Sequence, residues 1–331
     1  MKTNKAAVFG LCFVVLIISA VFGVCSGAVW ISPFKLAADA FDGIASPDER
    51  IIMYIRLPRV LGAMLSGAAL AVSGAVIQSV LANPLAAPNI IGVNAGAGLL
   101  TVLCAAFFPG AVKLLPTAAF LGAFGAVMLV YGIAKKTGAS RMTLVLAGIG
   151  VSSLLNAVID TVTTLCPDVL AGISSFKSGG FSGVTVKSLF PAWLFIAVGI
   201  AAAVMLSHDL DVLALGDNTA RSLGMNAGAV RFIFLVIAAL LAGASVSFSG
   251  LIGFVGLIVP HMARKITGTS ENTAVLPVCA LLGGAFLCLC DTLARTVFAP
   301  YELPTGIVVS YIGVPFFIWL LIRKKGGRHG A

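Results

Sequence analysis

The sequence predicts an all-α, polytopic membrane protein whose single domain contains about ten transmembrane helices. Hydrophobic residues make up 60% of the 331 residues and charged residues only 10%, and the mean hydropathy is +1.10. The hydrophobic residues occur in long runs separated by short polar turns, and a helix needs about 20 apolar residues to cross a bilayer. The 37 glycines favour close packing between such helices. Together these observations exclude a soluble protein.

The predicted spans follow one another along the whole chain, residues 1–331. They cover residues 6–29, 57–81, 90–108, 115–134, 142–165, 191–207, 230–249, 252–266, 274–298 and 304–322. The first has the outline of a signal peptide, but it is long for one and many spans follow, so we expect an uncleaved helix. Between the spans, residues 30–56 and 166–190 are expected as polar external segments, and residues 208–228 as a polar internal loop.

Basic residues predict the orientation of these spans. With ten spans, 13 of the 21 Lys and Arg fall on the side of the two termini and eight on the other side. Those of the first group cluster in short turns, such as 135–141, and at the C-terminal end, 323–328. Because cytoplasmic loops carry an excess of Lys and Arg, both termini are expected in the cytoplasm. The same topology explains the net charge of +9 without a nucleic-acid partner.

Residues 56–98 carry the clearest pattern in the chain. Arg56 and Arg59 open the stretch, a run of small and apolar residues follows, and Asn83, Pro84 and Pro88 interrupt that run. Charge is costly within a bilayer and proline lacks the N–H that a helix needs, so a span is expected to begin after Arg59 and to turn near Pro84. By residue class alone, the pattern also fits any transmembrane hairpin rich in small residues.

The particular residues narrow this choice. The segments RLPR (56–59), GAALAVSGAVIQ (67–78), NPLAAP (83–88) and GVNAGAG (92–98) resemble the signature of the FecCD family. Its members are permease subunits of ATP-binding-cassette importers for iron–siderophores, haem and cobalamin. The segments GFVGLIVPH (253–261) and ELPTG (302–306) extend the resemblance over nearly the whole chain. It implies the type II importer permease fold, an inverted repeat in which helices two to five correspond to helices seven to ten.

A weak internal echo accompanies this resemblance. Ser73-Gly74 is followed ten residues later by Pro84, and Ser249-Gly250 is followed ten residues later by Pro260. The second and seventh helices run in opposite directions under the predicted topology, as an inverted repeat requires.

The resemblance also implies site residues at the cytoplasmic side. The polar loop between the sixth and seventh helices is similar to the family's coupling loop, which docks on the ATPase subunit. The residues in that role would be Leu213, Leu215, Gly216, Asp217, Ala220, Arg221, Leu223 and Gly224. A solvated linker is the plain alternative, but its three leucines would then face water unless they packed on the membrane face. We therefore expect them to cover a partner's surface.

At the external mouth, Arg56, Arg59 and Arg295 match positions that receive acidic residues of a substrate-binding protein in the family. The alternative is that they anchor helix ends at the membrane interface, with Asp291 and Arg295 pairing with each other.

At the internal mouth, the resemblance implies a cytoplasmic gate. Asn83 and Leu85 match one gate position, and Ala139 and Ser140 fall where the family's second gate loop lies. The family has polar residues in that second loop, so the alanine departs from its pattern.

No motif for catalysis is present in the sequence. The patterns G-x-x-x-x-G-K-[ST], H-E-x-x-H and G-x-S-x-G are absent, and His208, His261 and His329 are scattered. We therefore expect no enzymatic activity, no metal site and no cofactor bound by this chain, with ATP used by a partner subunit.

The function implied by the resemblance is import across a bacterial cytoplasmic membrane. The partners would be a second permease chain, identical or paralogous, two cytoplasmic ATPase subunits and an external substrate-binding protein. The expected substrate is a ferric siderophore, with haem and cobalamin as alternatives. A secondary transporter driven by an ion gradient is the rival, but such proteins place ionisable residues near the membrane midplane. Asp160 and Asp291 are the only acids within the predicted spans, and both lie toward an outer end.

Overall fold

The computed structural model describes residues 5–27, 30–32, 47–138 and 140–326. All regular secondary structure in these residues is helical, which confirms the predicted all-α fold. The helices, in chain order, are α1 (Lys5–Cys25), α3 (Pro47–Ile51), η1 (Ile52–Arg56), α4 (Leu57–Val80), η2 (Pro88–Ile91), α5 (Val93–Phe107), η3 (Val112–Leu114), α6 (Leu115–Lys136), α7 (Arg141–Leu165), α8 (Pro167–Ser178), α9 (Val186–Met205), α10 (Ser207–Ala214), α11 (Asp217–Ser222), α12 (Ala227–Ser249), α13 (Val255–Thr267), α14 (Asn272–Thr296) and α15 (Thr305–Gly326).

Each predicted span overlaps one helix of the structure. Seven helical stretches in the described residues are long and apolar enough to cross a membrane, and α5 and Thr305–Leu320 of α15 are shorter apolar helices. Helix α13 has only 13 residues, which corresponds to about 20 Å, less than the hydrocarbon thickness of a bilayer. It therefore reaches only part of the way across.

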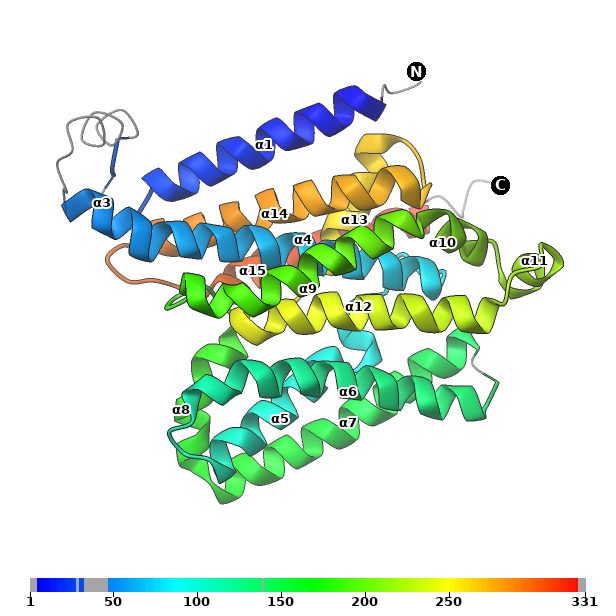
Figure 1. Ribbon diagram of the computed structural model, residues 1–331, viewed down its shortest axis with the longest axis horizontal. Helices are drawn as coiled ribbons and strands as arrows, with labels where there is room; N and C mark the ends of the chain where they lie inside the picture. The colour runs from blue at the N-terminus through cyan, green and yellow to red at the C-terminus, as the bar shows by residue number, and fades with distance from the viewer. Residues whose placement is uncertain (1–4, 28–29, 33–46, 139, 327–331) are drawn as a thin grey trace.

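The long helices lie side by side along the long axis of the molecule, with α1 at one edge and α5, α6 and α7 at the opposite edge (Figure 1). Between them, α14, α4 and α12 form the centre, where most side chains of α4 are buried. The start of α1 and the end of α15 lie at the end of the bundle that carries α10 and α11 (Figure 1). An even number of membrane crossings would place these two helix ends on the same side of the membrane.

Helix α4 can occupy the centre because its small residues allow neighbouring backbones to approach. A Cβ atom added at Gly67 would lie 2.1 Å from the carbonyl oxygen of Gly283 in α14. One added at Gly74 would lie 2.0 Å from the carbonyl oxygen of Gly256 in α13. Such separations are far below van der Waals contact, so only glycine fits at these crossings. The run of small residues in the sequence is thus a packing surface on two sides of α4.

The helix contacts agree with the predicted repeat. If α4, α5, α6 and α7 correspond to α12, α13, α14 and α15, the contact of α4 with α14 corresponds to that of α12 with α6. The contacts of α5 with α6 and α7 correspond in the same way to those of α13 with α14 and α15. In both halves a broken segment precedes the shorter helix: η2 precedes α5, and residues 250–254 precede α13.

The segment before α13 is bent, with two residues at positive φ. Gly250 has φ +68°, and Phe254, the residue before α13, has φ +62°. A positive φ is unfavourable for phenylalanine, so neighbouring structure must hold it. Gly313 of α15 gives its ring room, since a Cβ atom there would lie 2.5 Å from Cγ of Phe254.

Two segments that were predicted to be external differ from the prediction in their secondary structure. Residues 166–190 were expected as a polar stretch, but they contain α8, which begins with Pro167 at its first position and ends at Gly179 with φ +65°. Residues 47–56 were also expected outside a span, but α3 and η1 run continuously into α4, so the helical stretch is Pro47–Val80. The acids of residues 33–46 lie outside the described residues.

Candidate functional site

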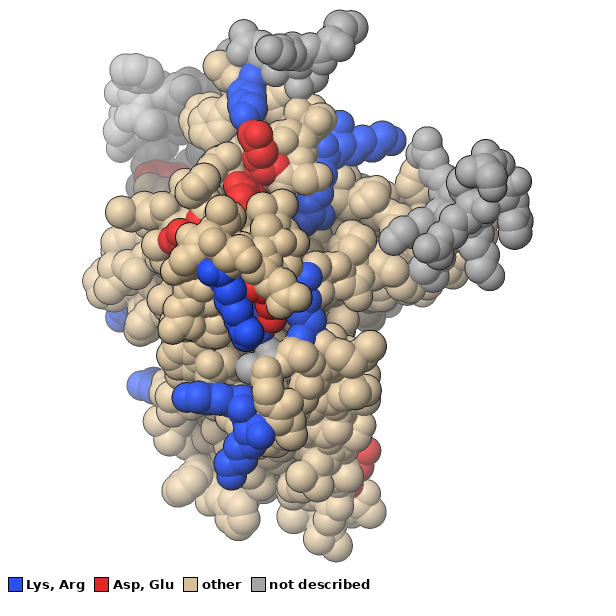
Figure 2. All heavy atoms as spheres, turned by 90° about the vertical axis from the view of Figure 1, so that its right-hand side faces the viewer, with Lys and Arg blue, Asp and Glu red and all other residues tan. Residues whose placement is uncertain are grey.

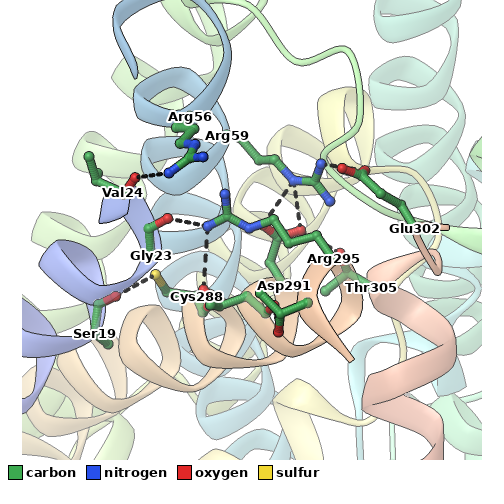
Figure 3. Close-up of polar contacts among 12 residues, drawn as sticks. Ser19, Gly23, Val24, Arg56, Arg59, Cys288, Asp291, Arg295, Glu302 and Thr305 are labelled. Atoms are coloured by element: carbon green, nitrogen blue, oxygen red, sulfur yellow. Dashed lines mark hydrogen bonds and ion pairs between the residues drawn. The ribbon is translucent and has the colours of Figure 1, made fainter. Parts of the chain in front are cut away.

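Arg59 is held inside the chain by two carboxylates, at the end of the bundle opposite α10 and α11. Its Nε donates to both carboxylate oxygens of Asp291 in α14, at 3.1 and 2.9 Å, and its Nη1 donates to Oε2 of Glu302 at 2.7 Å (Figure 3). The hydroxyl of Thr305 also donates to Asp291, at 2.8 Å. This network joins α4, α14 and the start of α15.

The other two arginines bind the end of α1. Arg56 donates from Nη1 to the carbonyl oxygens of Val24 and Cys25, at 3.0 and 2.7 Å, and Arg295 donates from Nη2 to the carbonyl oxygen of Gly23 (Figure 3). The last carbonyl groups of a helix lack partners within it and carry partial negative charge, so a guanidinium satisfies them. Arg56 and Arg59 thus face different helices although they lie three positions apart.

The predicted docking arginines are therefore buried in this conformation: Arg56 and Arg59 are each 6% exposed and Arg295 is 4% exposed. The expected pairing of Asp291 with Arg295 is secondary, because Arg295 Nε lies 3.7 Å from Asp291 Oδ2 while Arg59 makes the close contacts. The exposed charge of the cluster is Glu302, whose side chain is 48% exposed. A docking role for the arginines stays a prediction, and it would require them to exchange or share these internal partners.

The predicted coupling segment forms two short helices, α10 and α11, at the other end of the bundle. Leu215 and Leu223 are 66% and 65% exposed. Leu213, which was expected to face a partner with them, is instead fully buried against the rest of the chain. Ala220 is also buried, so it packs α11 onto the bundle. Gly216 and Gly224, with φ +116° and +82°, end the two helices and fix their directions.

Buried or half-buried ion pairs anchor these helices. Asp217, in the first turn of α11, accepts a hydrogen bond from Arg231 of α12 and lies 3.9 Å from Nε of Arg141 in α7. Arg141 Nη2 also donates to the carbonyl oxygen of Leu213, at 2.8 Å. The exposed leucines are therefore presented by an anchored unit. Arg221 is exposed on α11.

A second set of polar contacts joins α10 to the centre of the bundle, and the sequence did not indicate it. Asp211 Oδ1 accepts hydrogen bonds from both the backbone N–H and the side-chain amide of Asn272, each at 2.7 Å. Ser79 of α4 donates to Asn272 Oδ1 at 3.0 Å. The participants lie 61 and 193 residues apart in the sequence, so no local motif could reveal them. We call Asp211, Asn272 and Ser79 the α10 strut.

The α10 strut ends beside the predicted gate turn. Gln78, next to Ser79, accepts a hydrogen bond from Nη1 of Arg264 at 2.6 Å and donates to the carbonyl oxygen of Gly256 at 3.2 Å. The backbone N–H of Asn83 donates to the carbonyl oxygen of Gln78 at 2.9 Å. The end of α4 is thus tied to α10, to α13 and to the turn that follows it.

The gate residues themselves make local contacts. Asn83 Oδ1 accepts a hydrogen bond from the backbone N–H of Leu85 at 3.0 Å, which stabilises the turn. Ser140 caps the start of α7, where its hydroxyl accepts from the backbone N–H of Thr143 at 3.1 Å. Ala139 lies outside the described residues. These contacts explain the local residue choice, and a gating role stays a prediction.

Comparison with known proteins identifies the family. The sequence matches the FecCD transport family over residues 15–323. The chain belongs to the FecCD transport family. It is 38% identical over 312 residues to the Fe(3+)-citrate import system permease protein YfmE of Bacillus subtilis, covering 93% of this chain and 92% of that protein. It is 36% identical over 320 residues to the vitamin B12 import system permease protein BtuC of Citrobacter koseri, covering 94% and 93%.

A solved structure has the same fold as this FecCD protein. It is described as a metal-chelate type ABC transporter in an inward-facing conformation. The TM-score is 0.86 and the sequence identity 30%, and the alignment covers 96% of this chain and 99% of the other. The match extends over the whole helix bundle and confirms the permease fold expected from the sequence.

The end of this FecCD chain that carries α10 and α11 displays several basic side chains, with acidic side chains lying next to some of them (Figure 2). Lys5 at the start of α1 donates to Glu271 before α14, at 2.7 Å, and both side chains are exposed. This hydrogen bond, and then the charge of Lys5, lower the pKa of Glu271. The pKa of Glu271 is lower in the folded chain than in the unfolded chain, so the pair stabilises the fold fully at pH values above the ordinary pKa of glutamate. That stabilisation is lost as the pH falls through the lowered pKa.

Proposed function

We propose that this chain is the permease subunit of an ATP-driven importer for a ferric chelate. The observation that carries the proposal is the α10–α11 unit, which presents Leu215 and Leu223 to solvent while ion pairs and the α10 strut hold it to the bundle. Exposed apolar side chains surrounded by polar residues mark candidate protein-binding surfaces. An ATPase subunit that binds these leucines could therefore move helices of the bundle.

The transport cycle follows from linked equilibria. Two permease chains, identical or paralogous, would enclose a pathway, with an ATPase subunit on each and one binding protein outside. ATP and the loaded binding protein must each favour one of the outward-open and inward-open states, because a ligand shifts an equilibrium only by its difference in affinity. Motion of the α10–α11 unit would reach the turn at Asn83 through Asn272 and Ser79.

The orientation proposed for the chain places both termini in the cytoplasm of a bacterial cell. The basic end in Figure 2 would face inward under the positive-inside rule, and the ATPase subunits would bind there. The arginine cluster would then lie at the external mouth, where a binding protein would meet Glu302 first.

The proposed cargo is a ferric siderophore. The relatives include import permeases for Fe(3+)-citrate, for iron(3+)-hydroxamate and for vitamin B12. Cobalamin and haem therefore remain alternatives, and selectivity would lie largely in the binding protein. The rival, transport driven by an ion gradient, is disfavoured by Asp291, whose charge is neutralised by Arg59 in a buried pair.

The test of this function is association with the ATPase subunit. Leu223→Asp places a charge where the partner would bury a leucine, so we expect the ATPase to be lost on co-purification, with affinity reduced by about 2 kcal/mol or more. Leu114→Asp, at an exposed leucine of the opposite end, serves as the matched control and should retain the ATPase. The proposed function is wrong if the Leu223→Asp variant retains the ATPase fully. It is also wrong if the wild-type chain alone takes up substrate along an imposed ion gradient.

The α10 strut gives a separate prediction about coupling. Asp211→Ala removes the acceptor of two short hydrogen bonds, each worth about 1.5–3 kcal/mol when one partner is charged. We expect the ATPase to stay bound and to hydrolyse ATP, while the amount of chelate transported per ATP falls several-fold. Asp209→Ala, on the same helix, should leave the ratio unchanged. An unchanged ratio in Asp211→Ala would show that the strut does not transmit the movement.

A further inference from the structure

A cavity of about 290 Å³ lies between α1 and the ends of α13 and α14 that face it, at the end of the bundle that carries α10 and α11. We call this cavity the α1 groove. Apolar side chains make up much of its wall, and Lys5 is the one charged residue among those that line it. The lining residues are Lys5, Val8 and Phe9 of α1, Thr267 of α13, and Thr273, Ala274, Pro277 and Val278 of α14.

The length of α1 places the groove at the level of lipid headgroups. The helix has 21 residues, which corresponds to about 32 Å and matches the hydrocarbon thickness of a bilayer. Lys5 is the first residue of the helix, so it lies where the hydrocarbon region ends. Helix α1 forms an edge of the bundle (Figure 1), and its outer face exposes large apolar side chains, among them Phe9, Phe13 and Ile17. Lipid covers such a face, so a phospholipid is the molecule that meets the groove.

Two opposite charges lie together beside the α1 groove. Lys5 Nζ is 2.7 Å from Oε2 of Glu271, the residue before α14, and the two side chains are 63% and 58% exposed. An exposed ion pair contributes little to stability, so either partner can be exchanged at small cost. A headgroup that carries both a phosphate and an ammonium replaces this one pair by two, with the phosphate on Lys5 and the ammonium on Glu271.

The backbone of α14 adds a further acceptor to the groove. Pro277 lies inside this helix and lines the groove. Proline has no N–H, so the carbonyl oxygen of Thr273, four positions earlier, lacks its usual helical donor. Thr273 also lines the groove and follows Glu271 by two positions. The start of α14 therefore offers a carboxylate and a carbonyl oxygen to a ligand that donates hydrogen bonds.

These groups distinguish between the common phospholipid headgroups. A headgroup whose only charge is its phosphate is attracted by Lys5 but repelled by Glu271. A quaternary ammonium is attracted by Glu271 but has no N–H to donate. A primary ammonium has three N–H donors, as a lysine side chain does. Phosphatidylethanolamine carries such an ammonium two carbons from its phosphate oxygen, so one headgroup can reach both charges of the pair.

We propose that the α1 groove binds a phospholipid whose headgroup carries a primary ammonium, as in phosphatidylethanolamine. The phosphate binds Lys5, and the ammonium donates to Glu271 and to the carbonyl oxygen of Thr273. The start of one acyl chain packs between Phe9 and Pro277, and the rest of that chain lies along the exposed apolar face of α1. This site goes beyond the proposed importer function and depends neither on the cargo nor on the ATPase.

The experiment titrates the full-length permease in detergent with phosphatidylethanolamine, phosphatidylglycerol or phosphatidylcholine of identical acyl chains, and native mass spectrometry measures the bound lipid. We expect the wild-type chain to bind phosphatidylethanolamine about fivefold more tightly than either of the others. Glu271→Gln should abolish this preference, because it removes the acceptor of the ammonium and the repulsion of phosphatidylglycerol. Lys5→Gln should weaken the binding of all three lipids, since each carries a phosphate.

Two matched controls change exposed charges at the opposite end of the bundle. Lys113→Gln in η3 and Asp168→Asn in α8 should leave both the affinity and the preference unchanged. Ala274→Phe fills the groove and keeps both charges, so it should weaken the binding of every phospholipid.

The proposal is overturned if the wild-type chain binds the three lipids alike, or if Glu271→Gln keeps the preference for phosphatidylethanolamine. If Ala274→Phe instead separates a pair of permease chains on size-exclusion chromatography, the groove contacts a second copy and the proposal is also wrong. Both charge variants alter exposed side chains, so they test the site in a folded chain. Because no ATPase is present, their outcome is distinct from that of the test of the importer function.

Discussion

Gly74→Ala is expected to be among the most destabilising substitutions in the chain, although it adds a single methyl group. The added Cβ atom would lie 2.0 Å from the carbonyl oxygen and 2.4 Å from Cα of Gly256, and backbone atoms cannot rotate away as a side chain can. Helix α4 would have to separate from α13 and from the other helices that it packs against. We expect a loss of about 3 kcal/mol or more, at the upper end of overpacking effects.

The measurement is thermal unfolding of the purified permease in detergent. Gly125→Ala in α6 is the matched control, because nothing lies within 4 Å of the added Cβ atom. Replacing glycine by alanine at such an open helical position should stabilise the protein by up to about 1 kcal/mol. The two variants should therefore shift the midpoint in opposite directions. Similar midpoints for both would show that the crossing of α4 and α13 is looser than the structure describes.

The small-residue pattern that leads to this prediction was visible in the sequence, but its partners were not. Composition and the spacing of apolar runs were sufficient to locate the long helices, because a span must satisfy its backbone hydrogen bonds internally. Helix α8 was missed because its serines and glycine are weak helix formers. Tertiary contacts hold it instead: the backbone N–H of Leu251 donates to the carbonyl oxygen of Phe176, and that of Gly180 to Ser249, at 2.9 and 2.8 Å.

The candidate site was also only partly predictable from the sequence. The sequence predicted a polar loop whose leucines cover a partner's surface, and Leu215 and Leu223 are exposed. It was wrong for Leu213, although helical geometry disfavoured that residue: two positions apart on a helix is about 200°, so Leu213 and Leu215 cannot share a face. The α10 strut and the partners of Arg59 join distant segments, and one sequence contains no sign of such pairs.

The arginine cluster shows why those partners matter for function. Arg59 reaches a buried carboxylate of α14 and an exposed one of Glu302, so it links the interior of the bundle to its surface. If a binding protein presents an acidic group here, it competes for Arg59 with Glu302, the more accessible of the two carboxylates. Docking could then alter the packing at the start of α15 without moving Asp291.

Asp291→Ala should destabilise the permease strongly, because it leaves two guanidinium groups without their shared buried anion. Arg59 would keep Glu302 and Arg295 would keep the carbonyl oxygen of Gly23. Removal of one member of a buried ion pair costs about 3–5 kcal/mol, mainly through the charge left behind. Unfolding in denaturant, measured for the purified protein, should show a loss in this range.

Two comparison variants make the reason for the loss testable. Glu302→Gln removes the exposed partner of Arg59 and should cost less than about 1 kcal/mol, since exposed ion pairs contribute little. Arg59→Met combined with Asp291→Leu removes both charges, so it should lose less stability than Asp291→Ala alone if an unpaired buried charge is the cause. A double variant that is as unstable as Asp291→Ala would indicate that lost packing dominates. Added salt should leave the difference between Asp291→Ala and the wild-type protein almost unchanged, because buried charges are poorly screened.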